Sequence, residues 1–281
     1  MSPDQRLPVR RTAKLSIGGQ FPRSESGRTY EVVSSDGRFL AHAARASRKD
    51  LRDAVVAARG ALAGWAARTA YNRGQILYRV AEIMEGRRAQ FEDELRDSGA
   101  ADPAEEVSRA IDRWVWYAGW ADKIAQVAGG ANPVAGPYFN FTVPEPTGVV
   151  GIVAPAEPSL LGLVSRIAPV IVSGNVVVVV ASESSPLPAV SLAEALATSD
   201  LPGGVINILT GSPSELAPWL AAHMDVNAID LTGCPDDLIA EAERAAADNV
   251  KRVHRAGAAE QHLSEITAFV EFKTVWHPMG T

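Results

Sequence analysis

The sequence predicts an α/β fold with a parallel sheet, and the evidence lies between residues 148 and 234. In this stretch, three segments of helical length alternate with four short apolar runs: GVVGIVA, NVVVVVAS, GVINILT and NAIDLT. Such alternation is typical of βαβ units, in which helices cover the faces of a parallel sheet. The run Val176–Val180 is apolar at every position, as expected of a strand that is buried on both faces. Parallel sheets bind nucleotides at the carboxyl ends of their strands, so these ends are the candidate site.

The segment before this sheet predicts a layer of four helices. Residues 14–45 are rich in turn formers and short extended pieces. Apolar residues then recur at helical spacing. The expected helices begin after Ser47, centre on Ile76–Met84, cover Arg87–Arg96, and run from Asp102-Pro103 to about Val127. Ser47 and Asp50 approach a capping box, and Pro103 suits a first helical turn. We expect this layer to pack on the sheet.

Two further segments predict strands that stand apart from the sheet. Residues Tyr138–Val143 alternate with period two, but Pro144 and Pro146 follow, which favours an arm or edge over a central strand. Residues 268–276 also predict a strand, whose edge is exposed unless another strand pairs with it. The polar, Ala-rich stretch Val253–Gln261 is expected to be a linker or a continuing helix.

Composition and charge narrow the class of protein. The chain has 281 residues, of which 47% are hydrophobic and 21% charged, so one large or two modest globular domains are expected. Its net charge of -6 argues against nucleic acid or an anionic membrane as a main partner. The most apolar run, residues 167–182, is too short to span a bilayer, which takes about 20 residues.

Cysteine usage and the first residues favour a cytoplasmic location. Cys234 is the only cysteine, so neither an internal disulfide nor a site built on several cysteines is possible. Structural disulfides are rare in the reducing cytosol. The stretch MSPDQRLPVRR has no apolar core and does not predict a signal peptide. The five histidines show no metal-ligand spacing, and we expect no metal site.

Eight segments carry a family resemblance: LSIGGQF, SESGRTYEV, GWAARTAYNRGQILYRVAEIM, YAGWADKI, VPEPTGVVGIVAP, LPGGVINILTG, LTG at 231–233, and FVEFKTVW. Together they resemble the NAD(P)-dependent aldehyde dehydrogenase superfamily. The resemblance implies a Rossmann-like sheet with an N-terminal helical layer, an oligomerisation arm and a C-terminal strand. It divides the chain into an NAD-binding-like domain (1–250, including the arm at 136–146), a linker (251–267) and an oligomerisation strand (268–281).

Departures from the family pattern imply that catalytic residues are absent. The family's Pro-Trp-Asn-Phe-Pro turn is matched by residues 155–159, which place Glu157 where the family has an oxyanion-binding Asn. An ionised carboxylate cannot donate that hydrogen bond, and losing one such donor costs about 10²–10³ in rate. The family's ribose-binding Lys falls on Val180. The resemblance also implies that the catalytic domain is deleted between about Arg252 and the terminal strand.

Four positions match the family's cofactor contacts: Glu183, Gly211, Gly233 and Cys234. Tight strand-to-helix turns need both glycines even without a ligand. Cys234 would stand at a helix N-terminus, where thiol pKa values fall, although a small residue that fills a turn is the simpler interpretation. Glu157 has no identifiable catalytic partner, which favours a solvated turn residue. The resemblance implies no NAD(P) binding, or weak NAD(P) binding.

These features leave three functions open. The first is a pseudoenzyme that serves as an assembly or regulatory subunit of a hetero-oligomer with a full-length aldehyde dehydrogenase. The family's strand addition implies contact with that partner through the arm at 138–146 and the strand at 268–276. The second is an NAD(P)-dependent aldehyde oxidoreductase subunit that relies on a partner's catalytic residues. The third is a residual nucleotide-binding module.

Overall fold

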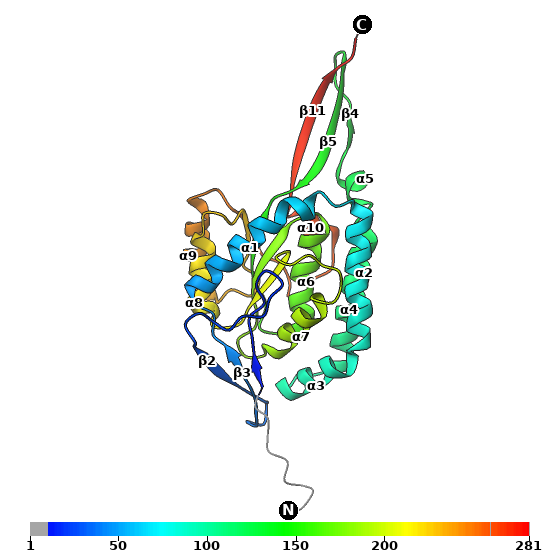
Figure 1. Cartoon of the computed structure of the whole chain (residues 1–281). Helices are drawn as coiled ribbons and strands as arrows, with labels where there is room; N and C mark the ends of the chain where they lie inside the picture. The colour runs from blue at the N-terminus through cyan, green and yellow to red at the C-terminus, as the bar shows by residue number, and fades with distance from the viewer. Residues whose placement is uncertain (1–10, 259, 281) are drawn as a thin grey trace, which may run out of the picture.

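The structure is a computed structural model that describes residues 11–258 and 260–280. A body of helices around a parallel sheet carries a narrow arm that extends from one end (Figure 1). The sheet has the strand order β10-β9-β6-β7-β8, and every neighbouring pair is parallel. Its strands are β6 (Val149–Val153), β7 (Val176–Val180), β8 (Ile206–Leu209), β9 (Ala228–Asp230) and β10 (Arg252–His254). The predicted Rossmann-like α/β fold is confirmed.

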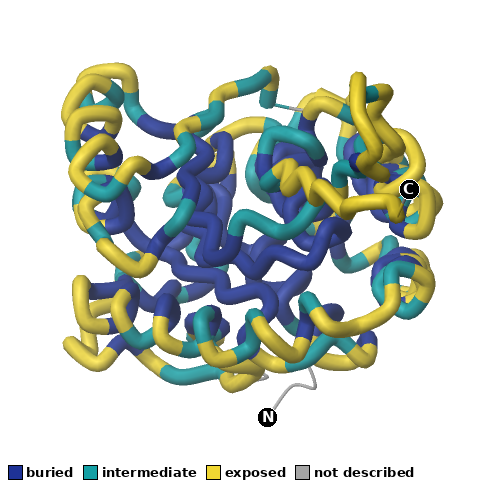
Figure 2. Tube along the Cα trace, turned by 90° about the horizontal axis from the view of Figure 1, so that it is seen from above, coloured by how far each residue is buried: buried dark blue, intermediate teal, exposed yellow. Residues whose placement is uncertain are grey.

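Helices cover both faces of this sheet. On one side lie α6 (Ser159–Val172) and α7 (Leu187–Leu196), and on the other lie α1 (Arg48–Ala66), α8 (Pro213–Ala222) and α9 (Asp236–Ala247) (Figure 1). Every residue of β6, β7 and α6 is buried. Seen from above, the strands form a buried centre, and the outer faces of the helices are exposed (Figure 2). The apolar character of Val176–Val180 thus reflects burial on both faces.

The four predicted N-terminal helices form, but they do not make one layer on the sheet. α1 packs on β7 and β8, whereas α2 (Ala70–Gly86), α3 (Arg88–Ser98) and α4 (Pro103–Trp120) pack against α6 and α7 on the opposite side. Ser47 and Asp50 make the capping box of α1. The last helix ends at Trp120 rather than near Val127, because the Lys123 ammonium binds the Gly119 carbonyl at 2.8 Å and the chain turns before α5 (Ile124–Ala128).

Before α1, a small sheet with the order β1-β3-β2 is built from β1 (Thr12–Ala13), β2 (Thr29–Val33) and β3 (Phe39–Ala44). These strands account for the short extended pieces expected between residues 14 and 45. The loop after β3 runs along the body to α1. Ala46 N–H donates to the Thr210 carbonyl at 2.9 Å, which holds this loop against the end of β8.

The segment predicted as a linker or continuing helix is different in the structure. It contributes β10 as the outermost strand of the parallel sheet, followed by the short helix α10 (Leu263–Thr267). The expectation rested on polar composition alone. Pairing of Val253 with Ile229 and burial of Glu265 organise this polar segment, and neither contact is visible in local sequence.

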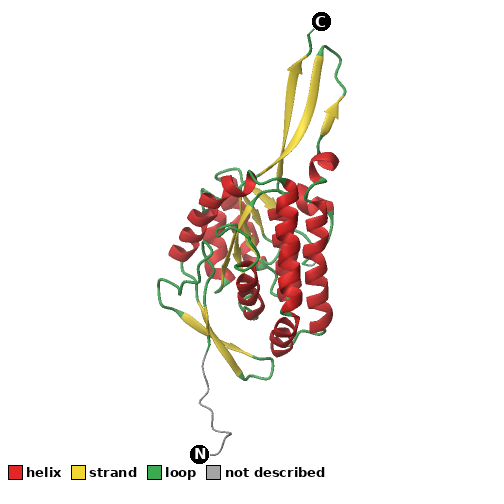
Figure 3. Ribbon diagram, turned by 45° about the vertical axis from the view of Figure 1, so that its right-hand side comes forward, coloured by secondary structure: helices red, strands yellow, loops and turns green. Residues whose placement is uncertain are grey.

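The arm is a three-stranded antiparallel sheet with the order β11-β5-β4. It comprises β4 (Gly130–Asn132), β5 (Tyr138–Pro146) and β11 (Val270–Pro278), and it projects away from the body (Figures 1 and 3). The predicted arm is therefore present. β4 pairs only with Asn140–Thr142 of β5, so β5 is central there and becomes an edge strand where Pro144 and Pro146 lie. A residue without an N–H is tolerated at such an edge.

Candidate functional site

The carboxyl ends of the parallel strands bring the predicted site residues to one end of the body. Glu157 lies in the loop between β6 and α6, and its side chain is exposed. Within the described ranges it makes no hydrogen bond or ion pair that would orient or activate it. It borders a cavity of about 660 Å³ together with Glu105, Arg109 and Ser184. The interpretation of Glu157 as a solvated turn residue fits this geometry.

Glu106 occupies the N-terminus of α6, beside the loop that holds Glu157. One carboxylate oxygen of Glu106 accepts hydrogen bonds from the N–H groups of Leu160 (2.9 Å) and Leu161 (3.1 Å). The free N–H groups of a helix N-terminus are the usual donors to a phosphate or an oxyanion. In this chain a buried carboxylate from α4 already uses two of them. The sequence analysis missed Glu106, because its contact spans more than fifty residues.

The end of β7 carries no cation at the position of the family's lysine. Val180 is fully buried and pairs with Val153 on one side and Leu209 on the other. Beyond it, the carboxylate of Glu183 lies 3.9 Å from the guanidinium of Arg45. Arg45 belongs to the loop after β3. The structure therefore places Glu183 against the protein's own cation rather than leaving it open to a ribose.

Close backbone contacts explain both predicted glycines. Gly211 has φ +137°, and a Cβ added there would lie 3.1 Å from the Ala46 nitrogen. A Cβ added at Gly233 would lie 2.1 Å from the Ala154 carbonyl oxygen, which is inside contact distance. The Gly233 N–H also donates to the Val153 carbonyl at 2.9 Å. Each glycine is thus required by chain packing, without any ligand.

Cys234 does not have the surroundings of a reactive thiol. Its side chain is buried before the first residues of α9. Burial raises the pKa of the Cys234 thiol, and the nearby carboxylates of Asp237 and Asp236 raise it further, against a lowering effect of Arg255. A helix N-terminus lowers a thiol pKa only where its field dominates. The buried position therefore favours a Cys234 that fills a turn over a low-pKa thiolate.

These positions fit a bound dinucleotide poorly. A pyrophosphate needs free N–H groups and positive potential at a helix N-terminus. Here α9 begins with the exposed carboxylates of Asp236 and Asp237. Glu106 uses the amides of α6, and Val180 supplies no charge. The strand ends retain the fold of a nucleotide site, but the N-termini of α6 and α9 and the end of β7 do not supply the free N–H groups and positive charge that a pyrophosphate needs.

An ionic cluster that the sequence analysis missed lies at the same end of the sheet. Arg166 of α6 is fully buried and forms an ion pair with Glu265 of α10. Its guanidinium also lies 3.7 Å from a carboxylate oxygen of Asp230, at the end of β9. His254, at the end of β10, contacts Glu265 at 3.0 Å. The one local signal was an arginine inside the otherwise apolar segment LLGLVSRIAPVIV.

Burial and charge shift the pKa values within this cluster. The hydrogen bond to Glu265 raises the pKa of His254, although burial opposes it. Burial also acts to raise the pKa of Glu265, but His254 and Arg166 outweigh it and lower that pKa. Burial raises the pKa of Asp230 despite the nearby Arg166. The cluster joins α6, β9, β10 and α10, so its evident role is to hold the 252–267 segment over the strand ends.

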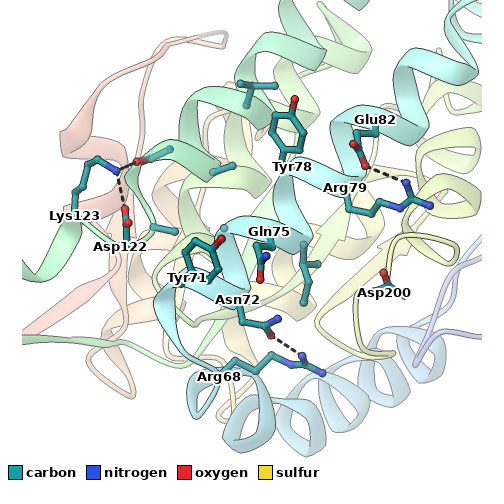
Figure 4. A pocket seen from close by; sticks show the side chains of 16 residues that line it. Arg68, Tyr71, Asn72, Gln75, Tyr78, Arg79, Glu82, Asp122, Lys123 and Asp200 are labelled. Carbon is teal, nitrogen blue, oxygen red and sulfur yellow. Dashed lines mark hydrogen bonds and ion pairs between the residues drawn. The ribbon is translucent and has the colours of Figure 1, made fainter.

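Another cavity, with a volume of about 880 Å³, lies between α2 and α4 (Figure 4). It is an open groove bordered by the exposed rings of Tyr71 and Tyr78. Its charged side chains bind near neighbours in sequence, as in the contact of Arg79 with Glu82 at 3.0 Å and of Lys123 with Asp122 at 2.7 Å. The groove offers no convergent set of groups for chemistry.

No group of histidine, cysteine, aspartate and glutamate in residues 11–258 and 260–280 is placed to hold a metal ion. No helix in the same ranges is both long and apolar enough to cross a membrane.

Comparisons with known proteins agree with the fold. The protein-family model described as "Aldehyde dehydrogenase family" matches residues 21–263 of the chain. Retinal dehydrogenase 2 of Homo sapiens is 34% identical over 262 residues, covering 90% of this chain and 49% of the relative. Cytosolic 10-formyltetrahydrofolate dehydrogenase of Pongo abelii is 34% identical over 260 residues, covering 87% of this chain and 28% of the relative.

Solved structures give the same result. HpcC from Thermus thermophilus superposes with a TM-score of 0.83 at 32% identity, covering 88% of this chain and 48% of that one. The NAD+ complex of aldehyde dehydrogenase from Bacillus cereus superposes with a TM-score of 0.82 at 26% identity. The match covers 87% of this chain and 50% of that one. The chain thus spans about half the length of these structures, and half or less of the relatives above.

Proposed function

Because the chain belongs to the aldehyde dehydrogenase family, we propose that it is a non-catalytic member that serves as an assembly or regulatory subunit of a hetero-oligomer with a full-length aldehyde dehydrogenase. The observation that carries this proposal is the arm. In the described part of the chain, β11 pairs on one side only, with β5. Its exposed side chains include Phe272, Val275 and Trp276. An exposed apolar edge strand is suited to strand addition onto another sheet.

The surroundings of Glu157 support the lack of catalysis. A carboxylate about 4 Å from a developing oxyanion would oppose it by about 1–4 kcal/mol, depending on the dielectric. The neighbouring donors of α6 bind Glu106. The raised pKa of Cys234 argues against a nucleophile at the only cysteine. We therefore expect no aldehyde oxidation by the isolated chain.

Weak or absent NAD(P) binding is part of the same proposal. The parallel sheet of this chain superposes on a family member whose structure holds NAD+. Val180 and the Arg45–Glu183 pair argue against a tight site. Calorimetric titration with NAD+ and NADP+ tests this point. A cytoplasmic location is also proposed, since relatives such as the Pongo abelii protein are named cytosolic.

Co-purification tests the partner directly. A tagged chain is co-expressed with each full-length aldehyde dehydrogenase of its native cell, and the captured proteins are identified by mass. We expect one of them to be retained. Removal of residues 270–280, which deletes β11, should abolish retention. The Tyr78→Ala variant, in the groove between α2 and α4, is the matched control and should retain the partner. If the chain captures none of these enzymes, the proposal is wrong.

A further inference from the structure

Two hydrogen bonds show which residues of β11 face β5. Thr147 N–H donates to the Phe269 carbonyl at 3.3 Å, and Met279 N–H donates to the Pro137 carbonyl at 2.8 Å. Both bonds join residues that lie opposite each other when the β5–β11 register is continued at either end. Hydrogen-bonded and non-hydrogen-bonded pairs alternate along an antiparallel ladder. The odd-numbered residues of β11 therefore bond to β5, and the even-numbered residues direct their N–H and C=O groups to the outer edge.

At both ends of the outer edge of β11, a main-chain group is missing or already bonded. The Val270 carbonyl, at the base of the arm, accepts a hydrogen bond of 2.7 Å from the Arg252 guanidinium. Pro278, at the tip, has no N–H to donate. Between them, the main-chain groups of Phe272, Thr274 and Trp276 face no other strand in residues 11–258 and 260–280. One end of the edge thus lacks a free acceptor, and the other end lacks a donor.

We propose that this edge pairs with the same edge of a second copy of the chain, antiparallel and about a two-fold axis at Thr274. In this register Thr274 lies opposite Thr274 of the second copy, and Phe272 lies opposite Trp276. Val270 lies opposite Pro278, so the carbonyl that Arg252 already binds meets the residue that has no N–H. Every remaining outward N–H and C=O group between these ends finds a partner.

Side chains favour the same register. It places Glu271 opposite His277 and the aromatic ring of Phe272 opposite that of Trp276, twice by symmetry. Aromatic cross-strand pairs stabilise a sheet. Both aromatic rings are more than half exposed in the single chain, at 52% for Phe272 and 58% for Trp276. The pairing therefore accounts for two of the large apolar side chains that the arm exposes.

Neighbouring registers are worse for identifiable reasons. A shift by one residue sets outward groups against inward ones, and no ladder forms. A shift by two in one direction places Lys273 opposite Lys273 and aims the Trp276 N–H at the carbonyl that Arg252 binds. A shift by two in the other direction places Lys273 opposite His277 and leaves the Phe272 carbonyl facing Pro278. Like charges opposite each other destabilise a sheet.

The shape of the molecule permits this dimer. The arm projects away from the body (Figures 1 and 3). Antiparallel pairing places the two bodies at opposite ends of the joined arms. The result is a six-stranded sheet with the two β11 strands at its centre. The inference does not rest on the proposed hetero-oligomer. Both assemblies use the same edge, so a partner strand would displace the second copy.

Disulfide cross-linking of the purified chain tests the register. A Thr274→Cys variant is made in a Cys234→Ser background and oxidised under air. Cα atoms of a hydrogen-bonded pair lie about 5.5 Å apart, within reach of a disulfide. The matched control is Val275→Cys, whose diagonal separation from its own copy would be about 7–8 Å. We expect at least about tenfold more cross-linked dimer for Thr274→Cys than for Val275→Cys, because only the first pair meets the distance limit.

A second measurement does not depend on either cysteine variant. Sedimentation equilibrium of the unaltered chain should show a monomer–dimer equilibrium. The Thr274→Pro variant removes an outward N–H and leaves the main-chain bonds to β5 in place, although it loses the side-chain hydrogen bond to Thr142, and it should shift the equilibrium to monomer. A monomer at every concentration, or equal cross-linking of the two cysteine variants, overturns the inference. Neither result bears on the hetero-oligomer, which co-purification tests separately.

Discussion

The strand ends of the parallel sheet and the edge of the arm differ in how their polar groups are satisfied. At the strand ends, the amides of α6 bind Glu106, Arg45 lies beside Glu183, and the charge of Arg166 is matched by Glu265. On the arm, the outward main-chain groups of β11 face no strand within the described residues. The comparison teaches that the charged side chains at the strand ends are paired within the chain, whereas the outward main-chain groups of β11 are left for another strand.

The largest expected effect tests whether the buried ion pairs of Arg166 stabilise the carboxyl ends of the strands. Arg166→Ala leaves Glu265 and Asp230 buried without their cation, which should lower the free energy of unfolding by about 3–5 kcal/mol. Urea denaturation measures the loss. Arg96→Ala removes an exposed pair with Asp93 and should cost about 0–1 kcal/mol. Equal losses in the two variants would mean that the buried cluster does not hold this end of the body.

The next effect concerns the N-terminus of α6. Glu106→Ala removes two charge-assisted hydrogen bonds and should cost about 1–3 kcal/mol of stability. It also frees the amides of Leu160 and Leu161, so inorganic phosphate should stabilise this variant and not the unaltered chain. Thermal unfolding with and without phosphate gives both answers. Glu105→Ala, at an exposed neighbouring position, should behave like the unaltered chain.

A smaller effect is the pH dependence that His254 contributes. Its pKa is raised above the ordinary 6.5 in the folded chain, chiefly by the hydrogen bond to Glu265. The protonated ring therefore contributes stability that is complete below the ordinary pKa and is lost as pH rises through the raised folded value. Urea midpoints of the unaltered chain should fall over this range more steeply than those of His254→Gln. Parallel pH profiles for the two would contradict the assigned role.

A substitution on the arm should affect assembly more than stability, in contrast to a substitution in the buried ionic cluster of Arg166, Asp230, His254 and Glu265. Trp276 is exposed, and the centroid of its ring lies 5.8 Å from the centroid of the Tyr138 ring. Trp276→Ser should therefore cost only about 0.5–1.5 kcal/mol of stability. It should nevertheless weaken dimerisation and capture of a partner strand, measured by sedimentation and by co-purification. A variant that unfolds, or one that assembles like the unaltered chain, would remove the contrast between the two regions.

The smallest expected effect is at the turn after β6. Glu157→Asn restores the family's amide at an exposed position and should change stability by no more than about 0.5 kcal/mol. We expect no aldehyde oxidation by this variant in the presence of NAD+, because Val180 and the amides bound to Glu106 are unchanged. Measurable turnover would show that the strand ends still support chemistry and would overturn the non-catalytic proposal.

Local sequence was enough to predict most elements of the body. The capping box at Ser47 and the uniform burial of Val176–Val180 follow from spacing and composition over a few residues. The expected linker was wrong, because polar composition cannot reveal that Val253 pairs with Ile229 or that Glu265 is buried. The helix expected to reach Val127 ends at Trp120, where the Lys123 ammonium donates to the Gly119 carbonyl only four residues away.

By itself, the sequence determined the βαβ order, the two glycine turns and the existence of the arm strands, because periodicity and turn chemistry act over neighbouring residues. Tertiary structure alone decided which groups fill the strand ends. Arg166 and Glu265 are 99 residues apart, and the contact of Arg45 with Glu183 also depends on the fold. It also decided which groups of β11 face outward, since the register with β5 assigns that direction to the even-numbered residues.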